Sequence, residues 1–442
     1  MMRVNPIGLL LTIVAILLPI IWLPALNHKG DTLALFSQYM GIASLIAMAI
    51  VQFISTRWRP VEWLFGGLDQ GYVFHKWLGI LSMLFILIHD TVDAEMNHLG
   101  GQNLLEEFAE TLGELSLYGL LILVVITIAT FIPYHLWRWT HRLMGLFFLA
   151  GAAHYLFILK PFQNGDPIGL YTSAFCVLGI MCFSYRLLPA RMRPARAYVV
   201  DSTEVTGNVL AVTLKPEGRP LRYRAGQFAF ASFVGSEPHP FTISKAPTED
   251  GSIRMSIARL GDFTTRLHRN LQVGSKLSLE GPYGHFERKN TGGQELWIGA
   301  GVGITPFLAW AHDLAPEDDA AHLVYCVKSE AAAAHLEELK ALAAVKPKLT
   351  LHIHSSATDG RADADSILAI TDQSAESLTV AFCGPKQMRQ ALKEGFAKNG
   401  VTGRKFKYEE FEIRTGVGLR KFANLLFNRI AIPEQIKAQA RR

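Results

Sequence analysis

The chain has 442 residues, 50% of them hydrophobic, and a formal net charge of +5. This length exceeds one ordinary domain, so we expect several, and the small positive charge does not require a nucleic-acid partner. Six long apolar runs precede residue 190, and a mixed sequence typical of a soluble α/β protein follows it. The four cysteines, Cys176, Cys182, Cys326 and Cys383, show neither CxxC spacing nor a disulfide framework.

Each apolar run has about the length needed to cross a bilayer. The runs cover residues 7–26, 35–55, 73–92, 115–133, 139–159 and 168–188. The first is too long for the apolar part of a signal peptide and lacks a convincing cleavage site, so we expect a retained membrane helix.

Basic residues in the connections predict the orientation of these runs. Ten fall on one side: Arg3, Arg57, Arg59, Lys76, Arg138, Arg142, Arg186, Arg191, Arg193 and Arg196. Only Lys29 and Lys160 fall on the other side. This bias predicts that both termini and everything after residue 190 are cytoplasmic.

Four histidines lie in two of the runs. His75 and His89 are 14 residues apart, and His141 and His154 are 13 apart. At about 1.5 Å per residue, each pair spans roughly 20 Å of the ~30 Å hydrocarbon core. Imidazole is costly in lipid and normally marks a function there. We expect His75 to pair with His141 near the cytoplasmic face and His89 with His154 near the outer face, each pair holding a haem by bis-imidazole ligation. The alternative is that they are helix-edge or bundle-interior histidines with hydrogen-bonded partners.

The 13-residue interval predicts an irregular helix. Fourteen residues return to within about 40° of the starting face, whereas thirteen miss it by about 140°. We therefore expect a π-bulge, kink or strong tilt in the run 139–159, plausibly at Gly151-Ala152-Ala153. Outside the membrane, Asp90 to Glu114 reads as an acidic loop with seven acids and no Lys or Arg. We favour a solvated face there over a surface that concentrates cations.

Short β-patterned segments begin near residue 197 and include 197–200, 209–214, 228–233 and 253–257. A flavin site needs an aromatic face, a hydroxyl near the redox nitrogen, and donors and close backbone for the pyrophosphate. Phe241 and Thr242, within His239-Pro240-Phe241-Thr242-Ile243-Ser244, and the turn from Gly261 to Thr264 supply these groups. Any one of these segments alone is compatible with an ordinary strand and turn.

A glycine-rich turn, Gly299-Ala300-Gly301-Val302-Gly303-Ile304-Thr305-Pro306, joins an apolar strand to a helix, as in sites that bind a pyrophosphate. An alternating αβ pattern follows it, and its last strand, 378–383, ends in Cys383-Gly384-Pro385, where ligands gather in parallel sheets. The alternative for Cys383 is a buried small hydrophobic residue. Lys328-Ser329 and Arg361 are candidates for holding a 2′-phosphate, or else ordinary surface residues.

Together these motifs resemble the NADPH oxidase/ferric reductase superfamily over residues 1 to about 412. In that family four histidines with this same spacing hold two haems in a six-helix domain. Gly66-Gly67-Leu68-Asp69 and His75-Lys76-Trp77-Leu78-Gly79 look like the bacterial ferric-reductase-like branch. The HPFTIS run matches a flavin-binding pattern, GAGVGITP the nucleotide loop, and Cys383-Gly384-Pro385 the segment near the nicotinamide. Tyr408-Glu409-Glu410-Phe411 resembles a closing motif whose Phe covers the flavin face.

The resemblance implies a multidomain fold. It comprises a six-helix transmembrane bundle (1–190), an antiparallel β-barrel FAD domain (197–290), a parallel α/β NAD(P)H domain (291–412) and a basic tail (413–442), which is either an amphipathic helix on the inner leaflet or frayed. The implied cofactor-binding residues are His239, Pro240, Phe241, Thr242, Ser244, Gly261, Thr264, Gly299, Gly301, Gly303, Thr305, Pro306, Cys383, Gly384, Pro385 and Phe411. Thr242, Cys383 and Phe411 are the expected catalytic residues.

The expected activity is electron transfer across a bacterial plasma membrane. Cytosolic NADPH or NADH is the donor, FAD and two b-type haems are the carriers, and oxygen or ferric iron is the outer acceptor. One alternative is a haem-binding membrane subunit that serves a protein or quinone partner. Another is a haem-free, membrane-anchored flavin reductase.

Overall fold

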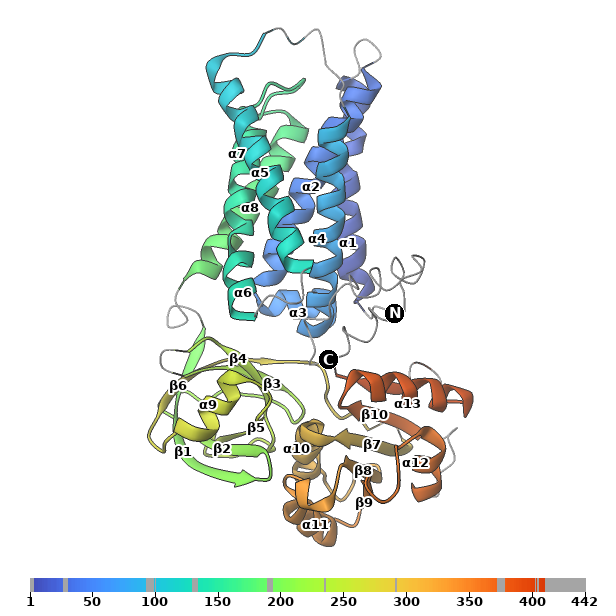
Figure 1. Cartoon of the computed structure of the whole chain (residues 1–442). Coiled ribbons are helices and arrows are strands. Elements are labelled where there is room, and N and C mark those ends of the chain that lie inside the picture. Colours follow the sequence, from blue (N-terminus) through green and yellow to red (C-terminus); the bar gives the residue numbers. More distant parts are fainter. Residues whose placement is uncertain are drawn as a thin grey trace, which may run out of the picture. The chain divides into compact units, whose positions relative to one another are not determined.

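The computed structural model describes residues 4–26, 31–92, 99, 101–128, 134–188, 194–233, 236–290, 292–371, 378–401, 403 and 405–409. These residues form two compact units (Figure 1). The first contains the described residues up to Leu187, apart from Gly67–Asp69, and is helical. The second contains the two β-sheets. Phe411 and the segment 413–442, for which the sequence predicts roles, lie outside the described residues.

The first unit is built from apolar helices. They are α1 (Pro6–Leu17), the 3₁₀ segment η1 (Leu18–Leu26), α2 (Thr32–Ser55), α3 (Arg59–Phe65), α4 (Leu68–Thr91), α5 (Leu104–Ile128), α6 (Tyr134–Arg142), α7 (Met144–Phe157) and α8 (Pro167–Leu187). Among the described residues, five helical segments are long and apolar enough to cross a membrane: Pro6–Leu26, Thr32–Ser55, Leu68–Thr91, Leu104–Thr127 and Pro167–Leu187. The membrane character of this half is thereby confirmed.

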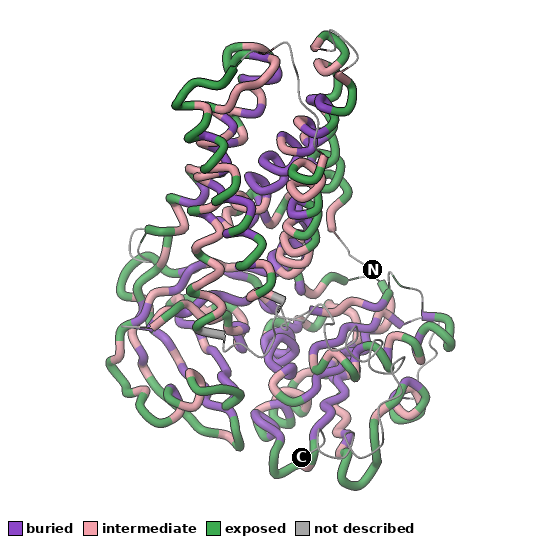
Figure 2. Tube along the Cα trace, turned by 45° about the horizontal axis from the view of Figure 1, so that its top comes forward, coloured by how far each residue is buried: buried purple, intermediate pink, exposed green. Residues whose placement is uncertain are grey.

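Helix α2 forms the centre of the helical unit. In its most apolar window 78% of the residues are buried, against 17–39% in the other four candidate spans. Figure 2 shows the contrast between buried interior segments and exposed outer faces of the helices. Because the exposed faces of α1, α4, α5 and α8 are also apolar, their surroundings are lipid rather than water.

The expected single helix over 139–159 is instead two helices. α6 ends at Arg142 and α7 begins at Met144, and the chain between them tightens where Leu143 N–H donates to the Thr140 carbonyl. The predicted irregularity is therefore present, but its predicted position at Gly151 is wrong. A Cβ at Gly151 would lie 2.9 Å from Ser116 Oγ, so this glycine allows α7 to pack closely against α5.

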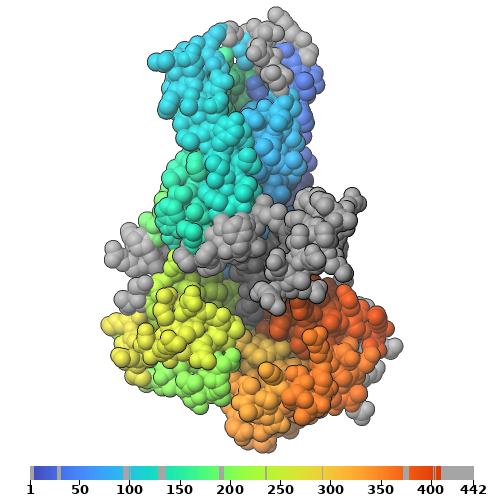
Figure 3. Space-filling view, viewed as in Figure 1, coloured from blue at the N-terminus to red at the C-terminus, as the bar shows by residue number. Residues whose placement is uncertain are grey.

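Helix α5 also differs from its prediction. It begins at Leu104, eleven residues before the expected start at 115, so the acids from Glu106 to Glu114 lie on helical turns rather than in a loop. Asn103 begins the helix by accepting from the backbone N–H groups of Leu105 and Glu106. In the space-filling view α5, coloured cyan, covers much of the visible face beside α4 (Figure 3). Charges at its first turns and an apolar remainder fit a helix that enters the membrane from water.

The second unit begins with a six-stranded antiparallel sheet in the order β4-β3-β6-β1-β2-β5. Its elements are β1 (Ala195–Thr206), β2 (Val209–Pro216), β3 (Phe228–Phe233), β4 (His239–Thr242), β5 (Ile253–Ala258), α9 (Asp262–Asn270) and β6 (Lys276–Tyr283). One antiparallel bridge, Ile243↔Met255, links the two outer strands. The sheet is therefore curled around its apolar core, which agrees with the antiparallel part of the predicted β-barrel.

A five-stranded parallel sheet follows, in the order β11-β10-β7-β8-β9. Its elements are β7 (Gln294–Ala300), η3 (Gly301–Ile304), α10 (Thr305–Asp313), β8 (Ala321–Val327), η4 (Glu330–Ala332), α11 (Leu336–Val345), β9 (Leu349–Ser355), α12 (Ala364–Thr371), β10 (Leu378–Cys383), α13 (Lys386–Lys398) and β11 (Phe406–Tyr408). One face of the sheet packs with α10 and α11, and the other with α12 and α13. This confirms the predicted parallel α/β architecture.

Candidate functional site

The four membrane histidines meet in two pairs. The ring centroids of His75 and His141 are 6.2 Å apart, and those of His89 and His154 are 6.4 Å apart. An imidazole nitrogen lies about 2.0–2.1 Å from a metal that it ligates, so two rings on opposite sides of one ion have centroids about 6.3 Å apart. Both pairs therefore have the spacing expected of two imidazoles that would hold one ion between them.

Three of these rings are oriented by backbone carbonyls. The contacts are His75 Nδ1 to Val51 O at 3.1 Å, His89 Nδ1 to Ser37 O at 2.9 Å, and His154 Nδ1 to Ala109 O at 2.9 Å. A carbonyl can only accept, so each Nδ1 carries the proton and each Nε2 keeps a lone pair. This is the arrangement by which metal-ligating histidines are normally fixed.

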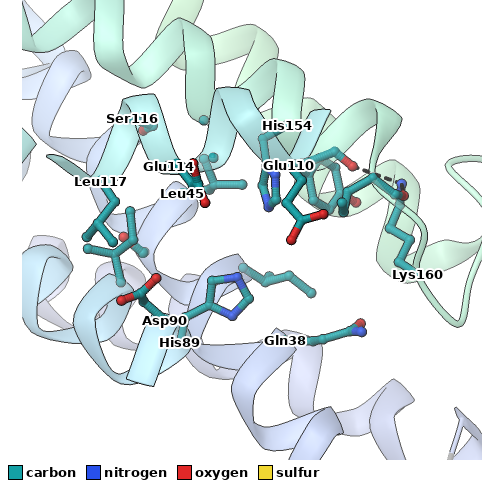
Figure 4. A pocket seen from close by; sticks show the side chains of 18 of the residues that line it. Gln38, Leu45, His89, Asp90, Glu110, Glu114, Ser116, Leu117, His154 and Lys160 are labelled. Carbon is teal, nitrogen blue, oxygen red and sulfur yellow. Dashed lines mark hydrogen bonds between the residues drawn. The ribbon is translucent and has the colours of Figure 1, made fainter. Parts of the chain in front are cut away.

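The outer pair faces a cavity of about 310 Å³ (Figure 4). His89 from α4 and His154 from α7 face each other across it, and Asp90, Glu110 and Glu114 lie at its edge. The Lys160 ammonium at the same end donates to the Tyr155 carbonyl at 2.8 Å, which caps α7.

Two glycines give the outer rings their room. A Cβ on Gly113 would lie 2.6 Å from His154 Nδ1, and one on Gly41 would lie 3.2 Å from the His89 ring. Larger residues at these positions would displace the imidazoles. The donor set, the ring spacing and this space together fit a bis-histidine haem site.

The inner pair has aromatic neighbours. The indole of Trp137, one helical turn before His141, stacks on the His141 ring with centroids 5.1 Å apart. On the other side the Tyr72 ring lies edge-on to His75, and its hydroxyl accepts from Arg57 Nε at 2.7 Å. These contacts restrict rotation of both rings.

The predicted flavin segment forms β4 and the residues after it. Thr242 is buried at the end of the strand, and Phe241 is half-buried. The His239 ring stacks on Phe263 of α9 with centroids 3.6 Å apart, a contact that the sequence does not reveal. The Ser244 hydroxyl is fully buried, donates to the Arg254 carbonyl and accepts from the Ser256 hydroxyl.

The turn at Gly261 begins α9. The Thr264 hydroxyl accepts from the backbone N–H groups of Leu260 and Gly261 and donates to the Gly261 carbonyl. Thr264 thus fixes the start of the helix, and the free N–H groups of the first turn remain available for an anion.

The glycine-rich turn lies between β7 and α10, and its glycines have different local roles. Gly301 has φ +56°, and no atom of the described residues lies within 4 Å of a potential Cβ, so its backbone leaves room for a ligand. A Cβ on Gly303 would lie 2.2 Å from the Cys383 carbonyl, so Gly303 allows the turn to pack against β10. The Thr305 hydroxyl donates to the Val302 carbonyl, and Pro306 occupies the first turn of α10.

Cys383 lies opposite Gly299 in the parallel pairing of β10 with β7, so the predicted nucleotide turn and the Cys383-Gly384-Pro385 segment are brought together. The thiol is fully buried. Burial raises its pKa well above the ordinary value, and the nearby Glu409 carboxylate acts in the same direction. Cys383 is therefore a neutral thiol rather than a thiolate.

A polar network joins the curled sheet to the parallel domain. The Glu338 carboxylate on α11 lies 2.9 Å from Arg254 Nη1 of β5 and 2.6 Å from His312 Nε2. His335 binds the same carboxylate through Nδ1 at 3.3 Å and the Ser256 hydroxyl through Nε2 at 2.8 Å. Burial alone raises the pKa of Glu338, but these hydrogen bonds and the Arg254 charge lower it well below the ordinary value.

Comparison with known proteins identifies the parts of the chain. Three family models match: ferric reductase like transmembrane component over residues 40–152, FAD-binding domain over 192–287, and oxidoreductase NAD-binding domain over 297–394. The chain is therefore similar to membrane oxidoreductases in three separate segments. More particularly, it joins a ferric-reductase-like transmembrane component to an FAD-binding and an NAD-binding domain.

Two curated relatives and one solved structure indicate the range of similarity. Ferric/cupric reductase transmembrane component 7 of Saccharomyces cerevisiae is 23% identical over 62% of this chain and 46% of its own length. Dual oxidase 1 of Sus scrofa is 26% identical over 48% of this chain and 14% of its own. The FAD/NAD-binding domain of nitric oxide dioxygenase from Vibrio cholerae is 26% identical over 50% of this chain and 99% of its own, with a TM-score of 0.44. The chain spans less than half the length of either curated relative.

Proposed function

We propose that this protein oxidises cytosolic NAD(P)H and reduces an acceptor on the outer face of a bacterial plasma membrane. Bound FAD would accept a hydride and release single electrons, and two b-type haems would carry these across the membrane. The proposed domains are 1–190 for haem, 197–290 for FAD and 291–412 for the nucleotide, with a basic tail from 413 to 442.

The histidine geometry is the observation that carries this proposal. Two imidazole pairs, one joining α4 to α6 and the other joining α4 to α7, have centroid separations of 6.2 and 6.4 Å, and carbonyl acceptors leave Nε2 available on three of the four rings. Ordinary interior histidines need not meet in two such pairs. Two ligand pairs at different depths suit electron transfer, because two histidines would hold each haem and leave no place on it for another ligand.

In the reductase unit, each proposed residue has a simple task. Phe241 would lie against the flavin ring with the Thr242 hydroxyl near its redox nitrogen, and the first turn of α9 would bind the pyrophosphate. Gly301 would admit the nucleotide pyrophosphate to the backbone of the turn. The buried Cys383 thiol would border the nicotinamide, and Phe411 would cover the flavin until the nicotinamide replaces it.

A reduced-minus-oxidised spectrum of the purified protein tests the haem assignment. We expect b-type Soret and α bands corresponding to two haems per chain. His154→Ala should remove about half of this absorbance and abolish outer reduction, while hydride transfer from NAD(P)H to flavin continues. A wild-type spectrum without haem bands would instead support the haem-free flavin reductase.

The acceptor is proposed to be oxygen or ferric iron. Superoxide dismutase-sensitive cytochrome c reduction measures the first, and trapping of Fe(II) by ferrozine measures the second. Activity that appears only after addition of a quinone or a partner protein would support the alternative of a haem-binding electron-transfer subunit.

We propose a preference for NADPH over NADH because Lys328 and Ser329 follow β8 at the carboxyl edge of the parallel sheet. The Lys328 carbonyl is held by Ala357 N–H and the side chain is exposed. Lys328→Ala should raise the KM for NADPH several-fold and leave that for NADH unchanged. Equal effects on both nucleotides would show that Lys328 does not bind a 2′-phosphate.

A further inference from the structure

His141 is held differently from the other three membrane histidines. Its Nδ1 lies 3.5 Å from the Thr127 hydroxyl, and among the described residues no backbone carbonyl bonds to it. The other three rings have carbonyl acceptors at 2.9–3.1 Å. One ligand of the inner pair therefore has a longer and weaker contact to a side chain of α5.

The direction of this contact follows from the second hydrogen bond of Thr127. Its Oγ1 donates to the Leu123 carbonyl at 2.8 Å, which uses the only hydroxyl proton. Thr127 can therefore only accept from His141. The sequence of bonds is His141 Nδ1–H to Thr127 Oγ1–H to Leu123 O, and donation to Leu123 strengthens the hydroxyl as an acceptor.

We propose that Thr127 is the positioning residue for His141. It holds the proton on Nδ1, which leaves Nε2 as the nitrogen that would bind iron. The stack of Trp137 on the same ring limits rotation, so the hydroxyl needs to fix only the tautomer and the tilt. This inference rests on the proposed haem function.

An acceptor on Nδ1 makes a metal-bound imidazole more basic, which favours the ferric state because that state carries more positive charge. Removing the acceptor should therefore favour the ferrous state of the inner haem. Loss of such a hydrogen-bond partner of a metal ligand typically lowers metal affinity or activity 10–100-fold. At a fixed potential we expect the ferric-to-ferrous ratio to fall about tenfold, which is about 59 mV for one electron.

Thr127→Val tests this inference, because it keeps the shape of the side chain and removes the hydroxyl. Spectroelectrochemical titration of the purified full chain should show one of two haem midpoints raised and the other unchanged. Thr127→Ser should restore the wild-type midpoint. Thr111→Val is the matched control, since Thr111 lies on the same helix and donates to the Glu107 carbonyl in the same way. It should leave both midpoints unchanged.

Haem content, measured as the pyridine haemochrome, separates the possible outcomes. Loss of one haem in Thr127→Val with two retained in Thr127→Ser would also support positioning by the hydroxyl. Two bound haems with unchanged midpoints in Thr127→Val would overturn the inference, as would a Thr127→Ser midpoint equal to that of Thr127→Val. A wild-type protein without haem would overturn the proposed function itself, which is a separate result.

Discussion

Two glycines in the helices leave space beside the outer histidines, because glycine has no side chain. Gly113 on α5 lies against the His154 ring and Gly41 on α2 lies against the His89 ring. A helix interior normally loses stability from glycine, by about 0.5–1 kcal/mol relative to alanine. These two glycines therefore lower the stability of their helices, and they allow the imidazoles to approach closely.

Gly113→Ala should expel the outer haem. The new Cβ would lie 2.6 Å from His154 Nδ1, so the ring must move and its bond to the Ala109 carbonyl must lengthen. We expect about half of the haem absorbance to disappear. Gly165→Ala in the connection between α7 and α8 is the control, because this glycine is exposed and no described atom lies within 4 Å of its Cβ. Full haem occupancy in Gly113→Ala would show that the His154 ring does not need its present position.

The buried Cys383 thiol should remain protonated during hydride transfer. Since burial raises its pKa well above 9.0, no titration of this group should occur between pH 7 and pH 9. We expect Cys383→Ala to lower the rate of flavin reduction by NAD(P)H without changing the shape of its pH profile in that range. A step in the wild-type profile that disappears in Cys383→Ala would contradict a neutral thiol.

Residue types that are unusual for their surroundings were predictable from sequence, and their partners were not. An imidazole in an apolar run is conspicuous, so the four histidines and their pairing by depth are expected from sequence alone. Thr127 carries no such signal, because a threonine in a membrane helix commonly bonds its own backbone four residues earlier. The His239–Phe263 stack likewise joins residues whose proximity follows only from the fold.

At the scale of helices, the 13-residue spacing predicts that the helix between His141 and His154 is irregular. It does not predict where the irregularity lies. The break at Leu143 places His141 on α6 and His154 on α7, and it leaves α7 regular through Gly151. From the sequence, Gly151 was the expected position of the helix irregularity. In the structure it instead allows close contact with Ser116. Sequence does not distinguish a glycine that bends a helix from one that admits a neighbour.

Between elements, the Glu338 network should stabilise the junction of α11 with β5. Glu338→Gln removes the charge shared by Arg254, His312 and His335, and we expect a loss of about 2 kcal/mol. Its lowered pKa means that this stabilisation is present above about 4.5 and is lost as the pH falls below that value towards the folded pKa.

The measurement for this prediction is the temperature of flavin release between pH 3 and pH 7. The wild type should lose stability below about pH 4.5, and Glu338→Gln should lose less over the same range. Glu337→Gln is a matched control, because the neighbouring Glu337 side chain is 85% exposed and pairs with Lys340 at the surface. Equal melting behaviour of the two variants would argue against a structural role for the network.

At the scale of the whole chain, the asymmetric distribution of charge predicts a direction for electron transfer. Both His pairs belong to helices whose basic connections predict a cytoplasmic end, so the pair His75–His141 would lie inside and the pair His89–His154 outside. An electron that leaves a negative interior is assisted by about 2.3 kcal/mol per 100 mV if it crosses the full membrane potential.

In proteoliposomes that contain the purified protein with its nucleotide domain facing the lumen and NADPH enclosed, a valinomycin potassium potential tests this direction. An interior-negative potential of 100 mV should accelerate outer reduction, by up to about 50-fold if transfer across the whole membrane limits the rate. Reversing the gradient should slow it, and an uncoupler should remove both effects. The same rate at both polarities would mean that charge transfer across the membrane is not rate-limiting, and acceleration by an interior-positive potential would contradict the proposed orientation. Gly165→Ala vesicles should respond as the wild type does, because this exposed residue lies outside the helices that carry the histidine pairs.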